Sequence, residues 1–145
     1  MVNAIGFDLV LETDPKPDEI HLLEERLYQI NVQTTGIDDA KLLAWFLRDD
    51  NEAVIGGTFG WTWGAACYIR YLYIPENLRR QGLGSALMRL VEGEAKARGC
   101  GQIVLETHDF QAPEFYQKLG FGVIGCVENY PLGRQYLTMV KRLVP

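Results

Sequence analysis

The spacing of apolar residues in the first quarter of the chain predicts one strand followed by one helix. Residues 5–12 (IGFDLVLE) have the composition of a strand. After Pro17 and Asp18, which are typical of a helix start, apolar residues recur at helical spacing at Ile20, Leu23, Leu27 and Ile30. The pattern predicts a helix over residues 17–33.

Residues 42–74 are rich in Val, Ile, Trp, Tyr and Phe. Turn-forming residues interrupt this stretch at 49–51 and again at 60–64. Short apolar runs separated in this way are typical of an antiparallel meander. We expect three strands here.

The pattern changes after Pro75 to one long helix, which ends near Gly99. Its apolar stripe consists of Leu83, Leu87, Leu90, Val91 and Ala95. A strand over 102–107, a short helix over 113–119 and two closing strands over 121–128 and 134–142 complete the chain. No repeat or linker interrupts the sequence, so we expect a single domain over residues 1–145.

Composition narrows the class of protein. The chain has 145 residues, 48% of them hydrophobic, which is enough for one core. A net charge of −5 with scattered Lys and Arg argues against a nucleic-acid partner. The sequence contains neither an apolar run of about 18 residues, as a membrane span requires, nor the pattern of a secretion signal. Three widely spaced cysteines, without a CxxC pair or grouped histidines, indicate no structural metal and a cytoplasmic location.

The segment from Arg79 to Ser85 (RRQGLGS) lies between a predicted strand and the start of the longest helix. A helix start presents unpaired N–H groups and the positive end of the helix dipole, and glycines let the backbone approach a ligand closely. The glycines could instead only form the turn, but together with two arginines they favour a pyrophosphate site. The segment lacks the Gly-Lys-Ser/Thr of a Walker loop, and position 87 is Leu where a dinucleotide fingerprint requires glycine.

This segment resembles the signature of the GCN5-related N-acetyltransferase (GNAT) family, Arg/Gln-x-x-Gly-x-Gly/Ala, with Arg79, Gly82 and Gly84 in the matching positions. The resemblance extends upstream to the strand at 71–74 and downstream to residues 112–121 (APEFYQKLGF), which are similar to the second acetyl-CoA motif of that family. Both motifs occur in order and cover about half of the chain.

The resemblance implies a mixed α/β (α+β) fold: a twisted, mostly antiparallel sheet of about seven strands, flanked by helices, whose fourth and fifth strands splay apart. It implies acetyl-CoA as cosubstrate, with the pantetheine arm between those strands. The backbone of Leu72, Tyr73 and Ile74 would receive pantetheine, and an N–H there could polarise the thioester carbonyl. The pyrophosphate would bind the backbone of the loop residues Arg79, Arg80, Gln81, Gly82, Leu83, Gly84 and Ser85.

Two further positions take their roles from the resemblance. Asp109 stands where family members often carry an Asn that bonds pantetheine; an Asp can accept but not donate such a bond, and it could instead cap the helix that begins near Pro113. Tyr116 occupies the position of the acid that protonates the departing thiolate. From its position alone, Tyr116 would be read as a core residue packed with Phe115 and Leu119; the motif favours the acid role.

The sequence does not identify the general base or the amine that accepts the acetyl group. Glu106, His108 and Asp109 follow the fifth strand of the family and could begin a water chain to the substrate nitrogen, although such residues are more often solvated loop residues. In the closing segment, Glu128 or Tyr130 could meet a cationic amine and Arg134 an anionic group, or the segment could be a plain hairpin turn.

We therefore predict an N-acetyltransferase that moves an acetyl group from acetyl-CoA to a primary amine of a small molecule or peptide, by direct attack in a ternary complex. A non-catalytic acyl-CoA sensor is the alternative, and it would not need Tyr116. A cysteine hydrolase is disfavoured because no spacing pairs a cysteine with His21 or His108. Dimerisation through the closing strands is an expectation from the family alone.

Overall fold

A computed structural model describes residues 1–144, and the chain divides into two compact units, Met1–Ile37 and the chain from Asp38 onward. The first unit contains a hairpin of β1 (Val2–Ala4) and β2 (Phe7–Leu9) and the helix α1 (Pro17–Thr35). The prediction of a single strand over residues 5–12 is wrong. Ile5 and Gly6 have φ values of 53° and 80°, and two left-handed residues form the tight turn that folds the segment onto itself.

Helix α1 confirms the predicted helix and extends it by two residues. The side chain of Glu19 accepts a hydrogen bond from the backbone N–H of Lys16. At the other end of the helix, the N–H of the left-handed Gly36 donates to the Val32 carbonyl. The predicted apolar stripe is present, but the helix has no buried residue in this structure.

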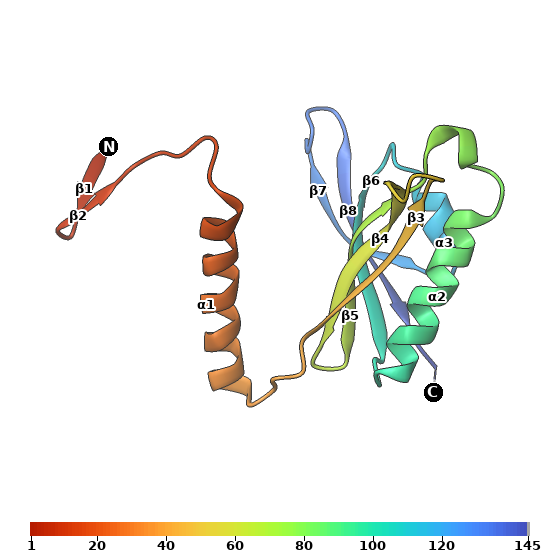
Figure 1. Ribbon diagram of the computed structural model, residues 1–145, viewed down its shortest axis with the longest axis horizontal. Helices are drawn as coiled ribbons and strands as arrows, with labels where there is room; N and C mark the ends of the chain where they lie inside the picture. The colour runs from red at the N-terminus through yellow and green to blue at the C-terminus, as the bar shows by residue number, and fades with distance from the viewer. Residues whose placement is uncertain (145) are drawn as a thin grey trace. The chain divides into compact units, whose positions relative to one another are not determined.

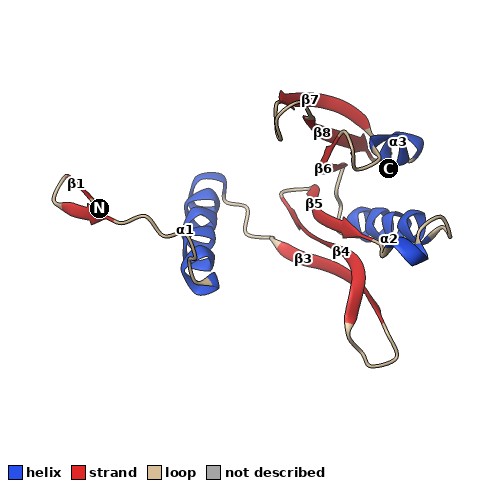
Figure 2. Cartoon of the chain, turned by 90° about the horizontal axis from the view of Figure 1, so that it is seen from above, coloured by secondary structure: helices blue, strands red, loops and turns tan. Residues whose placement is uncertain are grey.

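The second unit is built on a six-stranded sheet (Figures 1 and 2). Its strands are β3 (Lys41–Arg48), β4 (Val54–Trp63), β5 (Ala66–Tyr73), β6 (Gln102–His108), β7 (Gly122–Glu128) and β8 (Gln135–Arg142). They are ordered β3-β4-β5-β6-β8-β7, and every neighbouring pair is antiparallel except β5 and β6. The fold class is confirmed. The sheet has six strands rather than about seven because residues 7–9 of the first predicted strand pair with Val2–Ala4 in a separate two-stranded sheet.

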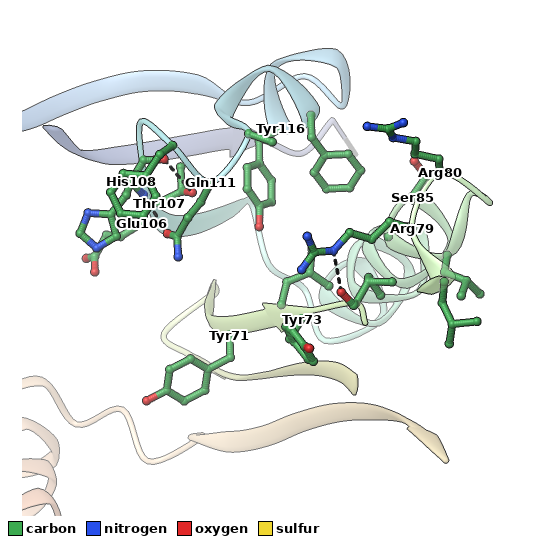
Figure 3. A pocket seen from close by; sticks show the side chains of 18 of the residues that line it. Tyr71, Tyr73, Arg79, Arg80, Ser85, Glu106, Thr107, His108, Gln111 and Tyr116 are labelled. Carbon is green, nitrogen blue, oxygen red and sulfur yellow. Dashed lines mark hydrogen bonds between the residues drawn. The ribbon is translucent and has the colours of Figure 1, made fainter. Parts of the chain in front are cut away.

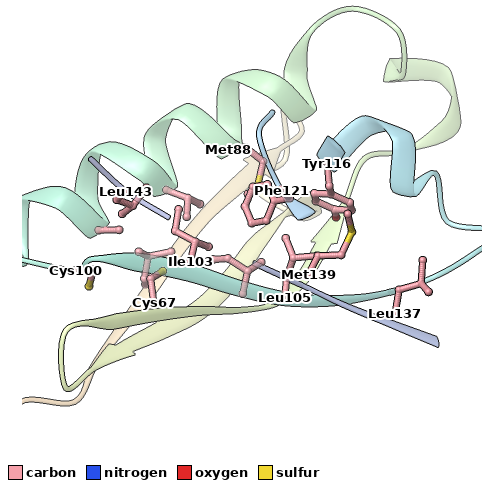
Figure 4. Packing of buried hydrophobic residues seen from close by; sticks show 14 residues of the cluster. Cys67, Met88, Cys100, Ile103, Leu105, Tyr116, Phe121, Leu137, Met139 and Leu143 are labelled. Atoms are coloured by element: carbon pink, nitrogen blue, oxygen red, sulfur yellow. The ribbon is translucent and has the colours of Figure 1, made fainter. Parts of the chain in front are cut away.

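The helices α2 (Leu83–Ala97) and α3 (Pro113–Lys118) lie on the same side of the sheet (Figure 2). A short 3-10 turn, Glu76–Leu78, precedes α2. The core lies between these helices and the sheet and includes the fully buried Ile103, Leu105 and Met139 (Figure 4). Of the predicted α2 stripe, Leu90 is 48% exposed and Met88 is buried instead. Leu90 lies at the edge of the helix face that meets the sheet.

The strands β5 and β6 part halfway along their length. Their parallel pairing covers Ala66 to Ile69 on β5 and ends at the pair Ile69 and Leu105. Beyond it, β5 continues only beside β4, and β6 continues only beside β8. These two strands are the fourth and fifth of the family, so the expected splay is present, and it opens a gap at the centre of the sheet.

Candidate active site

A cleft of about 910 Å³ occupies the gap where β5 and β6 part (Figure 3). Its walls come from the end of β5, the loop into α2, the end of β6, α3 and β8. Among the predicted site residues, those that line it are Leu72, Tyr73, Ile74, Arg79, Arg80, Gly82, Leu83, Gly84, Ser85 and Tyr116. Gln81 and Asp109 are not in this lining.

One end of the cleft is the start of α2. Gly82 is the N-cap residue with φ 82°, and the first helical bond runs from the Ala86 N–H to the Gly82 carbonyl. The N–H groups of Leu83, Gly84 and Ser85 therefore precede the helical ladder, and no side chain caps them. The first turn contains no acidic residue. This end suits an anion because the open donors and the helix dipole act together.

The two arginines of the loop differ in what they do. Arg79 Nε donates a 2.8 Å hydrogen bond to the Ile74 carbonyl, which ties the loop back to the end of β5. Arg80 has φ 63°, a left-handed conformation that is rare for a residue with a side chain. The sequence predicted charge from both residues, but it did not predict that Arg79 also orders the backbone.

Gly84 is required for packing as well as for access to the backbone. A Cβ at this position would lie 3.1 Å from the ring of Phe115, so the start of α2 rests directly on α3. Gly82 has open space around it, and only its positive φ makes a side chain costly there. The two sequence motifs thus touch each other.

Tyr116 lies on α3 between the core and the cleft. It is 9% exposed, and its ring meets Phe115 and Phe121 edge-on at 5.0 and 5.9 Å. Its hydroxyl points into the gap (Figure 3). Burial raises the pKa of this phenol to about 12, so the hydroxyl keeps its proton at neutral pH. The ring packs as a core residue and the hydroxyl faces the cleft, and the role of Tyr116 as the acid stays a prediction.

At the end of the cleft away from α2, a carboxylate is held by two phenols. Glu106 Oε2 accepts hydrogen bonds from the Tyr136 hydroxyl at 2.6 Å and from the Tyr68 hydroxyl at 3.1 Å. The bond to Glu106 is the largest cause that raises the pKa of Tyr136 to about 12. His108 lies beside Tyr136, with ring centroids 4.6 Å apart. Tyr68 and Tyr136 were not predicted to take part in this cluster, because strand pairing between distant segments brings them together.

The closing segment lies outside this cleft. Asp109 Oδ1 accepts a 2.9 Å bond from Arg134 Nε, and Arg134 also lies over the ring of Phe110. Ala112, without a side-chain bond, is the N-cap of α3, so Asp109 does not cap it. The assignment of Asp109 to the cofactor stays a prediction. Glu128 and Arg134 line a separate hollow of about 190 Å³, and Tyr130 contributes its carbonyl to His108 Nδ1 at 2.9 Å.

Within residues 1–144, no three or more His, Cys, Asp or Glu residues are placed to hold a metal ion. Cys67 and Cys100 are buried and Cys126 is exposed. Burial raises the pKa of Cys67 to about 12, which disfavours its thiolate as a nucleophile. No helix in this part of the chain is long and apolar enough to span a membrane.

Comparisons with known proteins agree with this geometry. The profile of the acetyltransferase (GNAT) family matches residues 7–121. An acetyltransferase of Agrobacterium fabrum is 30% identical over 120 residues, covering 83% of this chain and 88% of the relative. A blasticidin-S acetyltransferase of Streptomyces morookaense is 36% identical over 107 residues, covering 71% and 76%. The crystal structure assigned as an acetyltransferase of Agrobacterium tumefaciens has a TM-score of 0.84 at 28% identity and covers 94% of this chain and 100% of that chain.

A parted sheet whose gap meets the uncapped start of a helix suits a class of protein whose ligand joins an extended chain to a phosphate group. The matches above identify the class more narrowly: the chain belongs to the acetyltransferase (GNAT) family. The resemblance stated from the two motifs is thereby confirmed, as are the assignment to the acetyltransferases and, from the family, acetyl-CoA as cosubstrate.

Proposed function

We propose that this enzyme transfers the acetyl group of acetyl-CoA to a primary amine of a small molecule, by direct attack in a ternary complex. The observation that carries the proposal is the position of the Tyr116 hydroxyl in the cleft between the anion-binding start of α2 and the carboxylate of Glu106. Donor and acceptor would then meet at Tyr116 from opposite ends.

In the proposed donor site, the pyrophosphate of acetyl-CoA lies against the N–H groups of Leu83, Gly84 and Ser85, with Arg80 beside it. Pantetheine extends along the end of β5, where Leu72, Tyr73 and Ile74 border the gap. Peptide groups on this side of β5 face the cleft instead of β6, so an N–H there could bond the thioester oxygen as negative charge develops on it.

The reaction balances with groups from this chain. The amine nitrogen attacks the thioester carbon, a C–N bond forms, and the C–S bond breaks. Tyr116 donates its proton to the departing sulfur, so CoA leaves as a thiol, and the tyrosinate is reprotonated from solvent. The nitrogen loses one proton to become an amide.

Glu106 is our candidate to receive the proton that the nitrogen loses, or to bind the substrate as an ammonium ion before that proton leaves. Of the three residues considered from the sequence, Glu106 and His108 line the cleft and Asp109 does not. Two phenol donors fix Oε2 of Glu106, which orients the carboxylate toward a substrate. A small-molecule acceptor is supported by the likeness to the blasticidin-S acetyltransferase, which shares 36% identity with this chain.

The competing function is an acyl-CoA sensor that binds the cosubstrate without turnover. A screen of primary amines with acetyl-CoA, monitored by release of free CoA thiol, separates the two. The exposed Cys126 would react with the thiol reagent, so the screen should use Cys126→Ser. We expect thiol release with at least one amine. Binding of acetyl-CoA without turnover on any amine would favour the sensor.

A further inference from the structure

A positive charge stands next to Glu106 on the neighbouring strand. Arg70 and Glu106 each follow directly after the last paired residues of β5 and β6, Ile69 and Leu105, and both line the cleft. Ile69 and Leu105 are buried on the helix side. Since side chains alternate along a strand, Arg70 and Glu106 leave the sheet on the other side, where the strands begin to separate.

Arg70 is placed there by an irregularity in the sheet. On β4, Phe59 pairs with Tyr71 and the next residue, Gly60, pairs with Ile69, so Arg70 is the extra residue of a bulge. A bulge turns its extra residue out of the regular ladder and is common beside active sites. Gly60 permits this distortion because a Cβ there would lie only 2.0 Å from the Tyr68 carbonyl.

The guanidinium of Arg70 is anchored but not neutralised. Its Nε donates to the Tyr71 hydroxyl at 3.4 Å, and its carbon lies 5.5 Å from the Tyr71 ring centroid. Arg70 is exposed, and no ion pair within residues 1–144 includes it. The terminal nitrogens of an arginine form the fork that binds a carboxylate with two parallel hydrogen bonds.

Tyr68 lies on β5 two residues before Arg70, and its hydroxyl bonds Glu106. Burial is the largest cause that raises the pKa of Tyr68; the bond to Arg70 lowers this pKa, and the bond to Glu106 raises it. One phenol therefore interacts with both a cation and an anion. Arg70 and Glu106 do not form an ion pair with each other.

We propose that Arg70 is an anion subsite that selects acceptors carrying a carboxylate close to the reacting amine. The inference rests on the proposed function and narrows it to short, amino-acid-like zwitterions. The ammonium would face Glu106 and the carboxylate would face Arg70. Arg70 and Glu106 each come directly after the last pair of β5 and β6, so we take the two groups of the acceptor to be only a few bonds from each other.

The test compares matched pairs of ligands that differ only in the anionic group. The probes are α-amino acids, β-alanine and γ-aminobutyrate, each paired with its carboxamide. Dissociation constants are measured by ligand-observed NMR on the CoA-loaded protein, which needs no turnover. The parent should bind the preferred amino acid roughly ten- to a hundredfold more tightly than its carboxamide, as expected for a charge-assisted fork.

Arg70→Gln should reduce this selectivity ratio toward one, and Arg70→Lys should retain part of it, because Lys keeps the charge but not the fork. Glu106→Gln should weaken both members of a pair and leave their ratio largely intact. A parent ratio near one, or a ratio that Arg70→Gln does not change, would overturn the proposal.

Turnover assays on the same pairs then separate this inference from the proposed function. If the binding ratio depends on Arg70 but no amine is acetylated, the anion subsite stands and the transfer reaction fails. If amines are acetylated and the binding ratio does not depend on Arg70, the reaction stands and the anion subsite fails.

Discussion

Replacing Ser85 with aspartate separates the stability of α2 from its capacity to bind phosphate. Ser85 is in the first turn of α2 and lines the cleft, and that turn contains no acidic residue. A carboxylate there interacts favourably with the helix dipole, by about 0.3 to 1 kcal/mol. The same charge would repel a pyrophosphate bound to the neighbouring N–H groups. The ligand-free protein should therefore melt at the same temperature or higher, while the affinity for CoA falls.

The size of this loss follows from Coulomb's law. Two unit charges about 5 Å apart interact by roughly 1 to 3 kcal/mol for effective dielectric constants between those of water and a protein surface. This energy corresponds to about a five- to hundredfold increase in Kd for each phosphate charge that the introduced carboxylate faces.

Calorimetric titration of CoA into Ser85→Asp, with Ser85→Asn as the neutral control of similar size, measures the effect directly. Ser85→Asn should keep an affinity close to that of the parent, and the penalty of Ser85→Asp should shrink with added salt. A folded Ser85→Asp protein that binds CoA with the parental Kd would refute the placement of pyrophosphate at this helix start.

Two further predictions concern stability. Arg98 Nη1 donates 3.1 Å hydrogen bonds to the carbonyls of Lys41 and Leu42 and to Thr62 Oγ1. Arg98→Met should therefore lower the free energy of unfolding by about 1 to 3 kcal/mol in urea titration. The exposed Arg89→Met on α2 should have little effect, and equal losses would contradict the prediction. The pKa of the Cys67 thiol rises from 9.0 to about 12 in the folded chain, so ionisation of this thiol favours the unfolded state. As the pH rises from 9 toward 12, the free energy of unfolding should therefore fall by up to about 1.4 kcal/mol per pH unit. Cys67→Ala should reduce that slope, and an unchanged slope would count against the assignment.

The sequence predicted local features of the fold better than features that depend on distant segments of the chain. The start and end of α2 and α3 are set by Gly82, Pro113 and nearby turn residues, and the sequence predicted both helices and the loop before α2. The hairpin at Ile5 was missed because Ile is an unusual residue for a left-handed turn position, and the apolar pattern continues through it.

The acceptor end of the site depends on pairing between distant segments. Tyr68, Glu106 and Tyr136 come from three strands and meet only when the parallel and antiparallel registers are fixed. Arg70 was not considered, because the bulge that turns it out depends on β4, ten residues earlier. Asp109 was considered for the cofactor from its place in the motif, and its ion pair with Arg134 could not be foreseen from spacing.

The proposed acyl transfer takes place beside the Tyr116 hydroxyl, and Tyr116→Phe is its sharpest test. This change removes one hydroxyl and keeps the ring that packs on Phe115 and Phe121. At saturating acetyl-CoA and amine, we predict a fall in turnover by roughly 10² to 10⁴, toward the lower end because a thiolate is already a fair leaving group. The melting temperature and the Kd for acetyl-CoA should change little. A folded Tyr116→Phe enzyme that acetylates at the parental rate would rule out Tyr116 as the acid.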